Sequence, residues 1–100
     1  MFQKLDFLLE KYDELSMTVS DPDVIANQTV WQKHIREMSD MEPIVVGYRE
    51  YKKVLQDLAS TREMLEENGL DEEMRSMAKA ELGELEEKKE EMIRDLQIAL

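Results

Sequence analysis

Apolar residues recur at spacings of three and four along nearly the whole chain, which is the pattern of helices that each bury one face. The first such stripe starts at Phe2 and ends at Val19, and it predicts a helix over residues 2–19. A Ser-Asp-Pro-Asp segment at 20–23 ends this helix. Its Asp21 can cap a further turn, and Pro22 suits the first helical position. We therefore expect no more than a short helical turn over residues 24–26.

A second, longer stripe runs from Trp31 to Leu65 and predicts a helix over residues 29–67. Thr29 and Gln32 have the spacing of a capping box at its start. Pro43 falls inside the stripe, where it removes one hydrogen bond and clashes with the preceding turn at a cost of about 3 kcal/mol. Because the stripe keeps its phase, we expect one long helix that is kinked at Pro43, with a break there as the alternative.

Asn68-Gly69 predicts the end of this second helix, because glycine adopts the left-handed cap conformation without strain. Asp71 can cap a third helix over 71–100, in which apolar residues follow a nearly heptad spacing. The fold class expected is all-α: an antiparallel three-helix bundle with long coiled-coil-like helices, forming a single domain over residues 1–100. The third stripe is still intact at Leu100, so we expect the chain to be a fragment of a larger protein.

The chain has 24 acidic and 13 basic residues, a net charge of −11, which argues against nucleic acid as its main partner because phosphate binding needs a basic surface. An acidic surface favours solubility or a basic protein partner. No stretch approaches the ~18 apolar residues of a membrane span, and no signal peptide is recognisable. We therefore expect a cytoplasmic chain without a membrane contact.

Residues suited to catalysis are scarce. His34 is the only histidine, and a place at the edge of the apolar face is favoured over a role as general base. There is no cysteine, Gly-rich phosphate loop or nucleophile elbow, so we expect no metal, no cofactor and no enzyme. Eight methionines are compatible with an adaptable groove, but four of them lie on the apolar stripes, which favours core filling: Met38, Met41, Met74 and Met92.

Two charged segments are candidates for partner contact. Residues 48–53 form a basic, aromatic cluster, a combination that can stack on bases and meet phosphates. A helix spreads its basic residues over different faces, so packing is favoured and little direct nucleic-acid contact is expected. The acidic run at 86–91 is most simply a solvated face. The candidate contact residues from the two segments are Arg49, Lys53, Glu86, Glu87, Glu90 and Glu91.

Several segments, taken in order, resemble bacterial class I peptide chain release factors. They are LDFLLEKYDEL at 5–15, SDPDV at 20–24, EPIV at 42–45 leading into YREYK at 48–52, and the acidic third helix from MAKAEL at 77–82. Each is short and built of common residues, so the resemblance lies in their order and spacing, and it covers nearly the whole chain. SDPDV together with YREYK resembles the release factor 1 type, which reads UAA and UAG.

The resemblance implies the N-terminal domain of a ribosome-binding factor that acts in translation termination. In that family this domain is helical and lies beside the ribosomal stalk base, which implies stalk-base proteins as partners. We therefore expect the domain to help position the factor on the ribosome. The family's codon-reading loop and Gly-Gly-Gln loop are not in these 100 residues, so no catalytic residue is carried over. The methyltransferase that modifies the Gly-Gly-Gln glutamine is a second implied partner.

A function of another class stays open beside this one: a free-standing acidic coiled-coil scaffolding or adaptor domain that binds a partner helix. An open apolar stripe on the third helix would favour self-association of the isolated chain. A dimer would be compatible with both functions, because a domain without its neighbours can pair through the surface that they normally cover.

Overall fold

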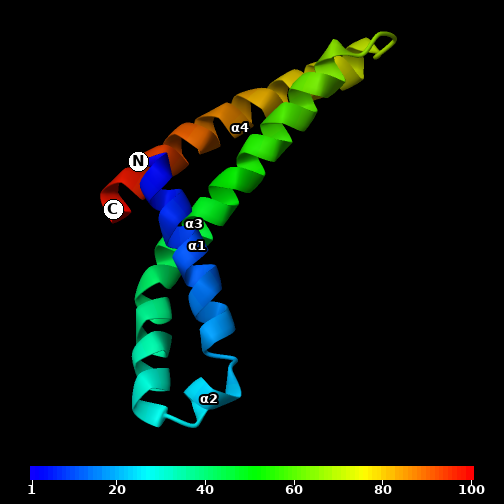
Figure 1. Cartoon of the computed structure of the whole chain (residues 1–100). Helices are drawn as coiled ribbons and strands as arrows, with labels where there is room; N and C mark the ends of the chain where they lie inside the picture. The colour runs from blue at the N-terminus through cyan, green and yellow to red at the C-terminus, as the bar shows by residue number, and fades with distance from the viewer. The chain divides into compact units, whose positions relative to one another are not determined.

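The computed structural model describes all 100 residues and contains helices and turns without any strand. Its elements are α1 (Phe2–Thr18), α2 (Pro22–Ile25), α3 (Gln28–Glu66) and α4 (Glu72–Ala99) (Figure 1). The all-α class is therefore confirmed, and each long helix lies within one residue of the bounds expected from the sequence. The chain divides into two compact units, Met1–Tyr48 and Arg49–Leu100, with α3 contributing to both.

The first unit pairs α1 with the beginning of α3 in antiparallel orientation (Figure 1). The Tyr48 hydroxyl donates a hydrogen bond to Oδ1 of Asp6, and the Phe2 ring stacks on the Tyr48 ring with centroids 6.5 Å apart. Near the other end of the pair, the indole Nε1 of Trp31 donates to the carbonyl oxygen of Val19 at 3.1 Å. Tyr48 is only 4% exposed, so its ring belongs to the core of this unit.

The short helix α2 forms as its capping residues predict. Oδ1 of Asp21 accepts the backbone N–H of Asp23 at 2.9 Å, and Pro22 occupies the first helical position. A proline is tolerated there because the N–H that it lacks would have no partner within the helix. The connection between α1 and α3 is thus a capped turn whose geometry is determined by neighbouring residues.

The start of α3 differs from the expected capping box. Oδ1 of Asn27 accepts the backbone N–H of Val30 at 3.4 Å, so Asn27 caps the helix and Thr29 is already inside it. The capping-box prediction at Thr29 is wrong because Asn is a strong N-cap residue and precedes it. From there α3 continues unbroken through Pro43, which is exposed, so the alternative of a break is also wrong.

The second unit is a hairpin of antiparallel helices, made by the remainder of α3 and α4 (Figure 1). Gly69 has a φ of +87° in the turn, and Oδ1 of Asp71 accepts the N–H of Met74 at 2.8 Å, as the sequence predicts for both residues. The side chains buried in this unit come from both helices, and they are Tyr51, Val54, Leu58, Thr61, Ala78 and Leu96.

Candidate interaction surface

The residues with catalytic potential do not converge. His34 is half-buried, so it lies at the edge of the apolar face as expected. Its Nδ1 atom has no hydrogen-bond partner. No group of three or more His, Cys, Asp or Glu side chains is arranged to hold a metal ion. On the hairpin, by contrast, charged and apolar side chains gather in distinct surface hollows.

The four glutamates singled out from the sequence lie together on α4. They line one shallow, open hollow of about 500 Å³, joined there by Arg94. Helical geometry produces this arrangement, because residues three and four apart occupy neighbouring positions on a helix surface. We call this surface the acidic hollow, and its lining residues are Glu86, Glu87, Glu90, Glu91 and Arg94.

The four glutamates of the acidic hollow are not equivalent. Glu86 is half-buried and forms an ion pair with Arg62 of α3, and its second oxygen lies 3.8 Å from Nζ of Lys89. The expectation of a simply solvated face is therefore wrong for Glu86, which links the two helices of the hairpin. Glu87 and Glu91 are exposed, so their carboxylates face solvent.

Glu90 adds an electrostatic effect on α3. Burial raises the pKa of the Tyr51 phenol above its ordinary value, and the negative charge of Glu90 raises this pKa further. Both causes have the same sign, because a phenolate is disfavoured by a poorly hydrated site and by a neighbouring carboxylate. Glu90 is thus exposed itself, and its charge raises the pKa of Tyr51, a buried residue of α3.

The two basic candidates lie apart from the acidic hollow. Arg49 and Lys53 are exposed residues of α3. Lys53 borders a separate hollow of about 270 Å³, which Lys88 of α4 and the carboxylates of Glu50 and Asp57 also line. Because two acidic side chains share this surface with the two lysines, it lacks the continuous basic patch that phosphate binding requires.

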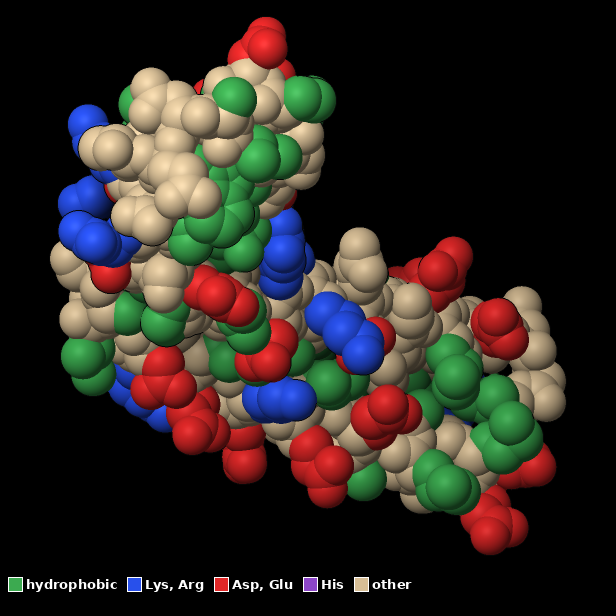
Figure 2. All heavy atoms as spheres, turned by 90° about the horizontal axis from the view of Figure 1, so that it is seen from below, with side chains coloured by type: hydrophobic (Ala, Val, Ile, Leu, Met, Phe, Trp, Pro, Cys, Tyr) green, Lys and Arg blue, Asp and Glu red, His purple; other side chains and the backbone are tan.

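An exposed apolar groove lies near the turn of the hairpin, where the sequence pattern favoured core filling over an adaptable methionine groove. Met64 of α3 and Met74 and Met77 of α4 line a groove of about 490 Å³, and they are 41%, 51% and 68% exposed. We call it the methionine groove, and its other lining residues are Ala78, Ala80, Glu81 and Glu84. Figure 2 shows apolar side chains gathered at this end of the hairpin with acidic ones around them. The core-filling prediction for Met74 is therefore wrong.

The structure is that of an all-α helical domain with antiparallel helices and charged surfaces. Comparison with known families identifies the family: the chain belongs to the PCRF domain family, whose model matches residues 8–100. The release-factor resemblance of the sequence motifs is thereby confirmed.

Relatives of the chain carry the name peptide chain release factor 1. The chain is 48% identical to the one from Clostridioides difficile (strain 630), 49% to the one from Alkaliphilus oremlandii and 50% to the one from Clostridium botulinum (strain Hall). Each comparison covers the whole chain and 28% of the relative's length. No solved structure matches the chain. None of its helices combines the length and apolarity that crossing a membrane requires.

Proposed function

We propose that this chain helps to position a release factor of the UAA- and UAG-reading type on the ribosome during translation termination. The observation that carries the proposal is the PCRF match over residues 8–100, together with about half of all positions identical to named release factors. Because the chain spans 28% of those relatives' length, the proposed role is that of one part of a factor. The scaffolding alternative has no comparable support.

The acidic hollow supports a protein contact for this positioning. Its exposed carboxylates at Glu87 and Glu91 can pair with lysine and arginine side chains of a basic ribosomal protein at the stalk base. Glu86, already paired with Arg62, holds α4 against α3 and so keeps this surface in place. With a net charge of −11, direct contact with ribosomal RNA is disfavoured.

The proposed role involves no chemistry by this chain. Its three glycines, Gly47, Gly69 and Gly83, are separated from one another, so it contains no Gly-Gly-Gln loop. Codon reading and hydrolysis of peptidyl-tRNA would fall to other segments of a full-length factor, in the cytoplasm. The methyltransferase acting on the Gly-Gly-Gln glutamine is the second proposed partner, in contact with the same full-length factor.

A chimera tests the proposal directly. In the Clostridioides difficile relative, the matching 28% is replaced by this chain, and peptide release is measured on purified ribosomes stopped at UAA or UAG. We expect release close to that of the unmodified relative. A chimera that folds but neither binds ribosomes nor releases peptide would contradict the positioning role.

The acidic hollow is tested within the same chimera. Charge reversal by Glu87→Lys and Glu91→Lys should weaken ribosome binding, and the loss should shrink as salt is raised, since exposed charges are screened. The matched control reverses two exposed carboxylates of α1, Glu10→Lys and Glu14→Lys. If both pairs weaken binding equally, overall charge and not the acidic hollow is responsible.

A further inference from the structure

The methionine groove has a defined geometry. Met74, Met77, Glu81 and Glu84 follow one another at spacings of three and four, so they form one face of α4, and Met64 of α3 lies at the same groove. This face changes along its length from apolar to acidic. The groove therefore offers an apolar floor at one end and two carboxylates at the other.

Small residues keep the groove open. Ala78 and Ala80 line it, and a Cβ atom added at Gly83, one helical turn further on, would meet no heavy atom within 4 Å. Methionine is unbranched and polarizable, so exposed methionines can adapt to the shape of an incoming apolar side chain. An exposed apolar patch of this kind with a charged border is typical of a protein interaction site.

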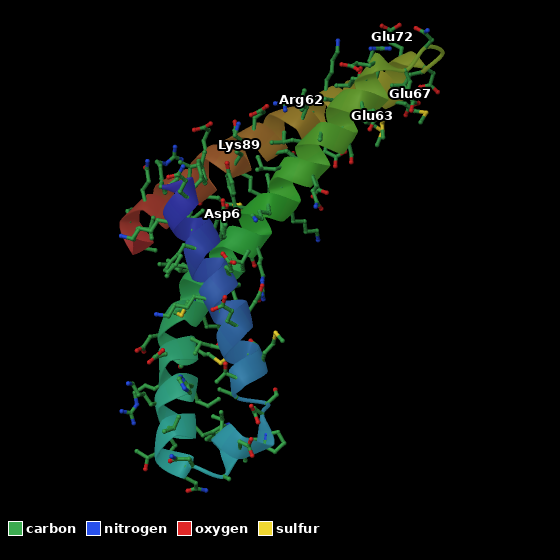
Figure 3. All side chains as sticks on the ribbon, viewed as in Figure 1. Asp6, Arg62, Glu63, Glu67, Glu72 and Lys89 are labelled. Atoms are coloured by element: carbon green, nitrogen blue, oxygen red, sulfur yellow. The ribbon has the colours of Figure 1, made fainter.

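The charge around the groove is strongly negative. Residues 61–84 contain eight acidic and three basic side chains. Two of the three cations are engaged, because Arg62 pairs with Glu86 and Arg75 donates to the carbonyl of Leu65. Further acidic side chains lie around the turn end of the hairpin, as Figure 3 shows for Glu63, Glu67 and Glu72.

We propose that the methionine groove binds a basic amphipathic helix of a partner protein. The apolar face of that helix would cover Met64, Met74 and Met77, and its lysines or arginines would reach Glu81 and Glu84. Charge complementarity selects this occupant. A second copy of the chain would bring its own acidic border against this one, and like charges facing each other oppose association.

This inference goes beyond the proposed function, because it concerns a different surface and does not require the ribosome. The probe is a synthetic peptide of leucine and lysine with the leucines at helical spacing. It is added to the whole 100-residue chain carrying ¹³C-labelled methionine methyl groups. We expect the methyl signals of Met64, Met74 and Met77 to shift, and that of Met17, which is 77% exposed on α1, to stay unchanged.

Two control peptides separate the contributions of shape and charge. A peptide with glutamate in place of each lysine should not bind, because its charges face the acidic border of the groove. A peptide with the same leucines and lysines in scrambled order should bind much more weakly, because it lacks a continuous apolar face. Equal binding of either control would overturn the proposal.

Variants of the chain locate the site. Met74→Gln with Met77→Gln should weaken peptide binding by about tenfold or more, since an interface depends on a few central apolar contacts. Met17→Gln is the control and should leave binding unchanged. Unaltered binding by the double variant, with helicity preserved by circular dichroism, would contradict the proposal.

A matched pair of neutralisations tests the charged border. Glu81→Gln with Glu84→Gln should weaken binding, whereas Glu10→Gln with Glu14→Gln, beside the exposed Phe7 of α1, should not. Equal losses would show general attraction to an acidic chain and would overturn the proposal. Methyl shifts at Met77 that depend on chain concentration without peptide would identify a second copy as the occupant, which also overturns it.

Discussion

The guanidinium of Arg75 donates a hydrogen bond from Nη1 to the carbonyl oxygen of Leu65 at 3.1 Å. Arg75 is the fourth residue of α4, and Leu65 is the last but one of α3. The final carbonyl groups of a helix have no partner within it and attract positive charge. The last turn of α3 has no basic residue of its own, so α4 supplies the cation that this helix end lacks.

Replacing Arg75 should therefore destabilise the hairpin. We expect Arg75→Gln to lower the free energy of unfolding by about 1.5 kcal/mol, the lower end of the contribution of a hydrogen bond that involves a charged group. Urea denaturation followed by circular dichroism measures the change. Lys79→Gln removes an exposed cation one turn later and serves as the control. A loss no larger than that of the control would refute a capping role for Arg75.

Gly69 and Gly83 should respond in opposite directions to alanine. Gly69 has a φ of +87°, which an L side chain adopts with strain, so Gly69→Ala should destabilise the chain by about 1 kcal/mol. Gly83 lies inside α4 with open space where a Cβ would be, so Gly83→Ala should stabilise it by about 0.5–1 kcal/mol. Thermal unfolding of both variants checks the pair. The prediction fails if the two melting temperatures move in the same direction.

The indole of Trp31 connects α3 to the end of α1 through the Val19 carbonyl. Trp31→Phe keeps an aromatic ring but removes the N–H donor, so we expect a loss of about 1 kcal/mol in the free energy of unfolding. Amide hydrogen exchange should become faster around residues 19–27, because this connection loses its hydrogen bond to Trp31. Gln32→Ala, at the exposed neighbouring position, is the control. Unchanged exchange in Trp31→Phe would show that this hydrogen bond does not stabilise the connection.

Tyr51 should make stability depend on alkaline pH. Its pKa in the folded chain is raised above the ordinary 10.0, first by burial and then by Glu90, so the unfolded chain loses this proton before the folded one. The stabilising effect is complete below pH 10.0 and is lost as the pH rises through the folded pKa. Tyr51→Phe should remove this part of the pH dependence in denaturant titrations.

Glu90 provides the second measurement for Tyr51. Glu90→Gln removes a carboxylate whose charge raises the phenol pKa, so ultraviolet titration should show Tyr51 ionising at lower pH than in the unchanged chain. The tyrosine contribution is isolated by subtracting the titration of Tyr51→Phe, which retains Tyr12 and Tyr48. An unchanged phenol pKa in Glu90→Gln would show that burial acts alone.

The sequence by itself determined where the helices lie and how several of them end. The Pro22 start of α2, the left-handed Gly69 and the Asp71 cap follow from interactions between residues no more than four apart, which a single chain segment displays completely. The order and spacing of short motifs also determined the family, which the match over residues 8–100 confirms. The cap at Asn27 was missed because Thr29 offered a competing pattern within the same few residues.

Only the tertiary structure decided which side chains of these helices are covered. Periodicity places Met74 on an apolar stripe, but whether the neighbouring helix covers that position depends on packing across the hairpin, and Met74 remains exposed. Glu86 belongs to an acidic run by sequence, yet it pairs with Arg62, which lies 24 residues earlier. The methionine groove likewise exists because packing across the hairpin leaves Met64, Met74 and Met77 exposed. Burial and ion pairing depend on which segments meet in space, and helical periodicity carries no information about the partner helix.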